Sequence, residues 1–362
     1  MARVKTERGD WGIVKNTWVR AGLSVISLAL AAALIVFLPR LIGTEWTHVL
    51  TELGRLAPAT IALLTALWLA SLWAYTFVLT SALPGLTHLQ ALSLNAAGSA
   101  VSNLLPFGGA AGVALTFTMT RGWGHPNRPV VVMTVVTGVW NTLFRFLLPA
   151  VGIVALLIAG RSPSDSVTSA AVVGALMIAT IVVTAGAALY WDAAAARLGR
   201  ILDRLNGLLP PRLRGEPGRA STGLERLRGN ITDVVHARWL GLTLGMAAFL
   251  GLQLALLFAC LHATGAYPGA AETVAAFALN RVLTTAVVSP SGSGFTEIGT
   301  ATALVAMGAP PSAATAAVLL FWFYTYVIEI PWGGLALGGW ALLKRRNGSG
   351  DPTPESAGAG QR

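Results

Sequence analysis

Charged residues are scarce in this chain. Of its 362 residues only 11% are charged, while 54% are hydrophobic. An ordinary soluble domain carries roughly 25% charged residues. The shortfall extends over most of the sequence, which excludes a soluble globular protein and indicates an all-α polytopic integral membrane protein.

Cysteines and enzyme motifs are also scarce. The one cysteine, Cys260, lies in an apolar run, so no intrachain disulfide can form and the thiol acts as a small hydrophobic group. No glycine precedes a lysine, and neither H-E-x-x-H nor G-x-S-x-G occurs. We therefore expect no enzyme activity, no catalytic residues, no metal site and no cofactor.

Positive charge is present, but it is confined to a few segments. The net charge is +10, and the cations gather in 1–20, in 192–238 with its nine arginines, and in 344–346. Such clusters mark cytoplasmic loops, so no nucleic-acid partner is expected. The composition is typical of a GC-rich bacterial genome, which places the protein in a bacterial inner (plasma) membrane. Both termini would be cytoplasmic, with 343–362 as a disordered tail.

Six apolar runs are long enough to cross a bilayer. A signal peptide is the competing interpretation of the first run, but no A-x-A site follows it. Apolar and arginine positions in 195–209 alternate as in an amphipathic helix at the membrane surface. The tryptophans are mostly expected to anchor the spans at the membrane interface. The expected spans are 21–38, 57–83, 129–160, 167–190, 239–261 and 312–342.

Two further apolar stretches, about 89–120 and 272–308, are each broken by a proline followed by glycines. Proline and glycine interrupt a helix, and in a membrane the freed backbone groups must be buried or line a cavity. Paired broken helices in corresponding halves of a chain indicate a transporter-type site. The residues predicted to line that site are Pro106, Gly108, Gly109, Pro290, Gly292 and Gly294.

The charge distribution constrains how these stretches cross the membrane. If the basic segments are cytoplasmic, each broken stretch makes no net crossing and is a re-entrant hairpin. The spans beginning at 57 and 239, the two prolines, and the spans beginning at 129 and 312 lie 182, 184 and 183 residues apart. A membrane domain over 21–342 would thus hold two inverted repeats, 21–160 and 167–342. An alternative, in which the broken stretches cross fully and the long spans split, stays open.

Ionisable residues at bilayer depth are functional candidates, because each costs about 2.5–3.5 kcal/mol or more. Two half-helix ends, Arg145 and Arg281 could cradle an anionic head group, with Glu297 and Glu329 balancing the arginines or carrying protons. Alternatively, the four charges pair as ion bridges within the bundle, and the asparagines join helices. The predicted substrate-binding residues are Arg145, Arg281, Glu297, Glu329, Asn141 and Asn280.

Both broken motifs resemble a known family. The run Leu104-Leu105-Pro106-Phe107-Gly108-Gly109 and the run from Ser289 to Glu297, followed by Gly308-Ala309-Pro310, are similar to the membrane domain of lysylphosphatidylglycerol synthases. The resemblance covers roughly 20–342. It implies a flippase-like domain, which in two-domain members moves aminoacylated phospholipid made by a separate C-terminal domain. We do not expect that domain here.

The first motif departs from the family's commoner form. Ala110, Ala111 and Val113 stand where an acidic residue and an arginine are expected, so the resemblance does not fix the head group. The sequence favours a flippase-like protein that moves a phospholipid or lipid-linked head group between leaflets. Its partner would be an anionic or zwitterionic membrane lipid. The alternative is a non-transporting scaffold for an envelope glycosyltransferase or lipid synthase, and either protein could be a homo-oligomer.

Overall fold

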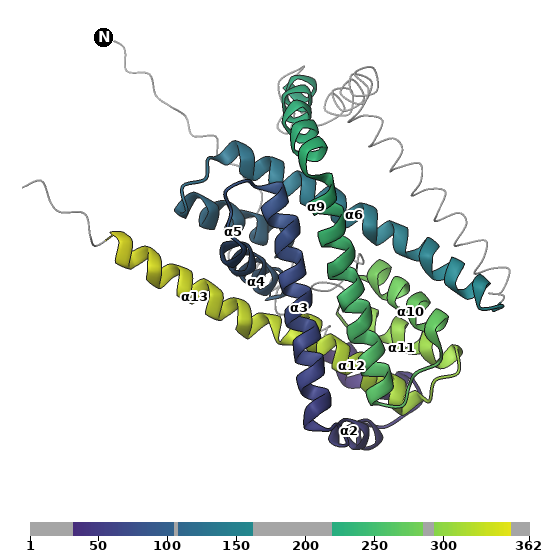
Figure 1. Ribbon diagram of the computed structural model, residues 1–362. Coiled ribbons are helices and arrows are strands. Elements are labelled where there is room, and N and C mark those ends of the chain that lie inside the picture. The colour runs from purple at the N-terminus through teal and green to yellow at the C-terminus, as the bar shows by residue number, and fades with distance from the viewer. Residues whose placement is uncertain (1–31, 105–107, 162–218, 285–292, 349–362) are drawn as a thin grey trace, which may run out of the picture.

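The computed structural model describes residues 32–104, 108–161, 219–284 and 293–348, and all regular secondary structure in these ranges is helical (Figure 1). This confirms the all-α prediction. The first described helix is Ala32–Leu41. It is followed by α2 (Trp46–Gly54), α3 (Pro58–Ala82), α4 (His88–Leu104), α5 (Gly108–Gly122), α6 (Asn127–Ile158), α9 (Arg219–Ala263), α10 (Ala270–Leu283), α11 (Phe295–Ala306), α12 (Pro311–Trp322), the π-helix η2 (Phe323–Val327) and α13 (Glu329–Gly348).

Four described helices are long and apolar enough to span a membrane: Pro58–Ala82, Asn127–Ile158, Val234–Ala263 and Pro311–Lys344. They coincide with four of the predicted spans, so this is a multi-pass membrane protein. A fifth span results if Ala32–Leu41 is counted with α2, across a bend of 95°. The predicted span 167–190 and the amphipathic segment 195–209 lie outside the described residues, as do the first residues of the predicted span 21–38.

The two broken stretches form two pairs of short helices. Helices α4, α5, α10 and α11 have 17, 15, 14 and 12 residues, which correspond to lengths of about 18–26 Å. A bilayer core is about 30 Å thick, so none of them is long enough to cross it upright. Because α4 packs on α5 and α10 packs on α11, each stretch is a helical hairpin, as predicted.

Glycine allows the first hairpin to close tightly. A Cβ atom on Gly108 would overlap the backbone carbonyl of Ser102, and one on Gly112 would lie 2.7 Å from the Ser102 hydroxyl oxygen. That hydroxyl donates a hydrogen bond of 3.2 Å to the Gly108 carbonyl. The glycines after Pro106 therefore permit close contact between α4 and α5, besides interrupting the helix.

The helices pack reciprocally around a central pair. Helices α3 and α9 run side by side (Figure 1), while the first hairpin packs through α4 on α13 and the second packs through α10 on α6. Each hairpin therefore packs against the last span of the other half of the chain. An internal repeat predicts this exchange, because equivalent faces meet equivalent partners. Gly245 brings the central pair together, since a Cβ there would lie 3.0–3.2 Å from Val78 and Phe77.

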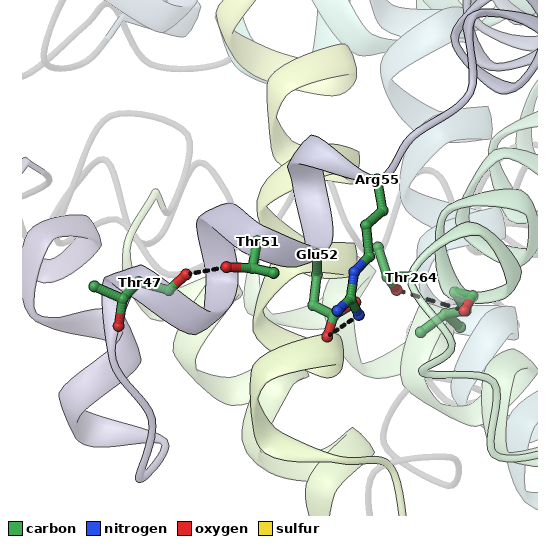
Figure 2. A network of polar contacts seen from close by, with 6 residues as sticks. Thr47, Thr51, Glu52, Arg55 and Thr264 are labelled. Atoms are coloured by element: carbon green, nitrogen blue, oxygen red, sulfur yellow. Dashed lines mark hydrogen bonds and ion pairs between the residues drawn. The ribbon is translucent and has the colours of Figure 1, made fainter.

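The sequence analysis did not anticipate α2. This short helix follows the bend after Leu41, and the indole N–H of Trp46 donates to the Val36 carbonyl at 2.9 Å. Its exposed side chains interact locally: Thr51 donates to the Thr47 carbonyl, and Arg55 pairs with Glu52 at 3.4 Å (Figure 2).

The last predicted span is not one continuous α-helix. Pro331 has no N–H to donate to the carbonyl four residues earlier, and the turn before it widens into η2. The Ile328 N–H bonds the Phe323 carbonyl, five residues back, at 2.9 Å. Short π-helical insertions of this kind often lie at functional sites.

One tryptophan is an exception to the general expectation that these residues anchor the spans at the membrane interface. Trp68 in α3 is 3% exposed. Its ring meets Trp332 edge-on at 5.8 Å and lies 6.4 Å from Tyr324. These contacts join α3 to η2 and α13 inside the bundle, because the wide turn of η2 presents aromatic rings to α3.

Candidate functional site

A cavity of about 230 Å³ lies where the two hairpins meet α12 and η2. Both halves of the chain contribute to it, α4 and α6 from the first, and α10, α11, α12 and η2 from the second. Four of the predicted site residues line it, namely Arg145, Arg281, Glu297 and Asn280. Residues more than 130 positions apart in the sequence therefore share one polar cavity inside an apolar bundle.

Arg281, near the end of α10, is held in place by aromatic rings. Its guanidinium carbon lies 4.9 Å from the centre of the Phe277 ring and 5.8 Å from that of Phe321. The Nε atom is buried and has no hydrogen-bond partner among the described residues. A buried, unpaired guanidinium donor is costly, so this group is suited to receive an anion.

Arg145 faces the same cavity from α6. It is near enough to Arg281 for the two positive charges to repel each other. Two cations therefore converge on a cavity whose lining includes one carboxylate, that of Glu297.

Glu297 has a structural role at the edge of the cavity. It is 5% exposed, and its carboxylate accepts a hydrogen bond from the backbone N–H of Gly294 at the start of α11. Gly294 has φ = +92°, and a Cβ there would lie 2.5 Å from the Leu34 side chain. Glu297 therefore caps the half-helix after the second break, where glycine is required by both conformation and space.

Glu329 is placed differently from the other three charges. It lines neither this cavity nor the larger cleft between α3, α4, α5 and α6. It is within hydrogen-bonding reach of Ser99 and Asn103, and it attracts Arg281 electrostatically. All four charges lie in the described part of the chain, and no ion pair joins any two of them. Ion pairs do form at other places, as between Arg161 and Glu272. The alternative of direct ion bridges among the four is therefore not what the structure shows.

Two stacked aromatic residues on the last span contact both hairpins. The rings of Trp322 and Tyr326 are 5.7 Å apart and nearly parallel. The Tyr326 hydroxyl donates to the Asn103 carbonyl at 2.7 Å, at the end of α4, and the Trp322 indole N–H donates to the Ser293 hydroxyl at 3.4 Å. The sequence analysis did not assign these two residues to the site.

A second, larger cleft of about 550 Å³ lies between α3, α4, α5 and α6. Asn141, one turn from Arg145 on α6, lines this cleft and not the smaller cavity. Arg145 and Asn103 line both, so the two spaces adjoin there. Gly109 also lines the larger cleft, and Gly108 lies in the hairpin contact. The remaining predicted break residues, Pro106, Pro290 and Gly292, lie outside the described residues.

These features define a class of protein, a multi-pass helical membrane protein with a polar cavity between two broken-helix hairpins. Residues 24–333 match the family described as the lysylphosphatidylglycerol synthase TM region. The match covers most of the chain, which therefore belongs to that family, and it confirms the resemblance in the motifs around Pro106 and Pro290. The family is consistent with a membrane lipid-related role. Comparison with curated proteins gives no match.

Proposed function

We propose that this protein translocates a phospholipid or lipid-linked head group between the two leaflets without changing it chemically. The observation that supports this most directly is the convergence of Arg145 and Arg281 on one cavity, where Arg281 Nε has no hydrogen-bond partner within the described part of the chain. An anionic head group would offset the cost of holding both charges at that depth, about 2.5–3.5 kcal/mol each.

The arrangement of the hairpins supports movement of the head group across the membrane. A site built at the junction of two repeats, with discontinuous helices pointing into it, allows alternating access when one half rocks against the other. Under this proposal the hairpins enter from opposite sides of a bacterial inner membrane, and both termini are cytoplasmic. The larger cleft would be the route by which a head group reaches Arg145.

Reconstitution tests the proposal. The purified chain would be placed in vesicles with a trace of acyl-labelled fluorescent phosphatidylglycerol, and the label in each leaflet measured by chemical quenching. We expect translocation with the native chain, and at least about a tenfold loss with Arg281→Ala or Arg145→Ala, as for a lost charge-assisted contact.

Arg55→Ala is the matched control. Arg55 is also an arginine, but its side chain is 70% exposed and pairs with Glu52 on α2. This variant should translocate lipid at the native rate. If lipid moves no faster with the native chain than in empty vesicles, the transport proposal fails. A chain that instead co-purifies with an envelope synthase, and whose cellular role survives Arg281→Ala, would be a scaffold.

A further inference from the structure

The side chains that line the larger cleft are uncharged, with one exception. Many of them carry hydroxyl or amide groups, the others are apolar, and Arg145 is the only charged residue among the described ones. The neighbouring breaks, 105–107 and 285–292, contain no Asp or Glu in their sequence. The polar lining residues include Asn95, Thr134, Thr137 and Asn141.

Several of these groups can still form hydrogen bonds. Thr134 and Thr137 donate to the Val130 and Met133 carbonyls of their own helix, both at 2.8 Å, which leaves their oxygens as acceptors. Asn95 and Asn141 form no hydrogen bond with another described residue, so each can both donate and accept. Neutral donors and acceptors side by side recognise hydroxyl groups, which likewise donate and accept.

The smaller cavity has the opposite character. Two arginines line it, and the carboxylate of its acidic residue, Glu297, already accepts a hydrogen bond from the Gly294 N–H. Glu329 lines neither space, and Arg281 attracts it. Two arginines that line one cavity favour a phosphate, whereas an ammonium group in the larger cleft would face Arg145 with no carboxylate among the described lining residues to offset the repulsion.

We propose that the head group is a phosphate that carries an uncharged polyol, either a glycerol or a sugar, and not an aminoacylated cationic group. The phosphate would lie between Arg145 and Arg281, and the hydroxyls would lie among the amides and threonines of the larger cleft. This inference rests on the proposed function and specifies the substrate class of the same site.

The test compares three acyl- or prenyl-labelled lipids in vesicles that contain the purified full chain. The probes are phosphatidylglycerol, its lysyl ester, and a short-chain polyprenyl phosphate bearing one hexose. We expect at least one polyol probe to move about tenfold or more faster than the lysyl ester, because juxtaposed like charges oppose binding. Comparing the two polyol probes identifies the source of the polyol.

The possible failures are distinguishable. If the lysyl ester moves as fast as both polyol lipids or faster, the substrate class is wrong while transport stands. If no probe moves faster than in empty vesicles, the proposed function fails and this inference fails with it.

A charge-introducing variant tests the same point within one protein. Asn95→Asp keeps the shape of the side chain and places a carboxylate in the larger cleft. The rate for the lysyl ester relative to phosphatidylglycerol should then rise about tenfold or more. The control is Asn127→Asp, at the start of α6 and outside both cavities, where the side chain accepts a hydrogen bond from Arg121. An equal rise in this control, or no rise with Asn95→Asp, would overturn the inference.

Discussion

Two adjacent glycines in α13 provide an internal comparison of packing energy. Gly333 is buried against α4, where a Cβ would overlap the Ala96 carbonyl oxygen and lie 2.5 Å from the Ala100 Cβ. Gly334 is exposed, and a Cβ there meets nothing within 4 Å. The change Gly333→Ala should therefore separate α13 from α4, and Gly334→Ala should not.

The size of the difference follows from two opposing effects. Replacing a helical glycine by alanine favours the helix by about 1 kcal/mol at either position. At Gly333 the new methyl group must displace α4 backbone atoms, and such overpacking costs about 1–3 kcal/mol. Gly334→Ala should thus raise the free energy of unfolding by up to about 1 kcal/mol. Gly333→Ala should have a free energy of unfolding about 1–3 kcal/mol below that of Gly334→Ala.

Unfolding in mixed micelles of a mild detergent and sodium dodecyl sulfate, followed by circular dichroism, measures this free energy for both variants and the native chain. The comparison is sensitive because both changes add the same methyl group to the same helix, one residue apart. If Gly333→Ala unfolds with the same free energy as Gly334→Ala, α13 does not lie against α4 as described.

Two further predictions use the same assay. Tyr326→Phe removes the donor to the Asn103 carbonyl, at 2.7 Å. It should lower the free energy of unfolding by about 0.6 kcal/mol, and by no more than about 1.7 kcal/mol; an unchanged value would mean that this hydrogen bond does not hold α4 against η2. Glu272→Gln weakens a pair in which the carboxylate is 7% exposed and lies 2.9 Å from Arg161. The free energy of unfolding should fall by about 1 kcal/mol, a value kept small because Arg161 itself is exposed. The control, Glu52→Gln on α2, should change the free energy of unfolding little. Equal effects of the two glutamate changes would contradict the buried placement of Glu272.

Much of the fold could be predicted because it depends on local composition. A bilayer fixes the length of a span, so long apolar runs identified α3, α6, the apolar part of α9 and the last span. Proline with following glycines identified both hairpins, because those residues interrupt a helix wherever they occur. The bend before α2 and the widened turn of η2 have weaker local signals. A single proline, Pro331, is compatible with a kink, a break or a π-helix.

The site could be predicted only in part. Arg145 and Arg281 were found because a charge in an apolar run is costly wherever that run packs. The sequence could not show whether they face each other, a carboxylate or a third group, since that depends on how α6 and α10 are rotated against one another. Packing placed the two arginines at one cavity, and it placed Glu329 within hydrogen-bonding reach of Ser99 and Asn103.

The sequence by itself therefore determined that this chain crosses a membrane several times, where its helices break, and which charges lie at depth. Hydropathy and backbone hydrogen bonding decide these points residue by residue. Only the tertiary structure decided that Trp322 and Tyr326 connect the two hairpins, and that the larger cleft brings neutral polar side chains together with Arg145. These features depend on contacts between distant helices, which arise when small residues such as Gly245 and Gly333 allow the backbones to approach.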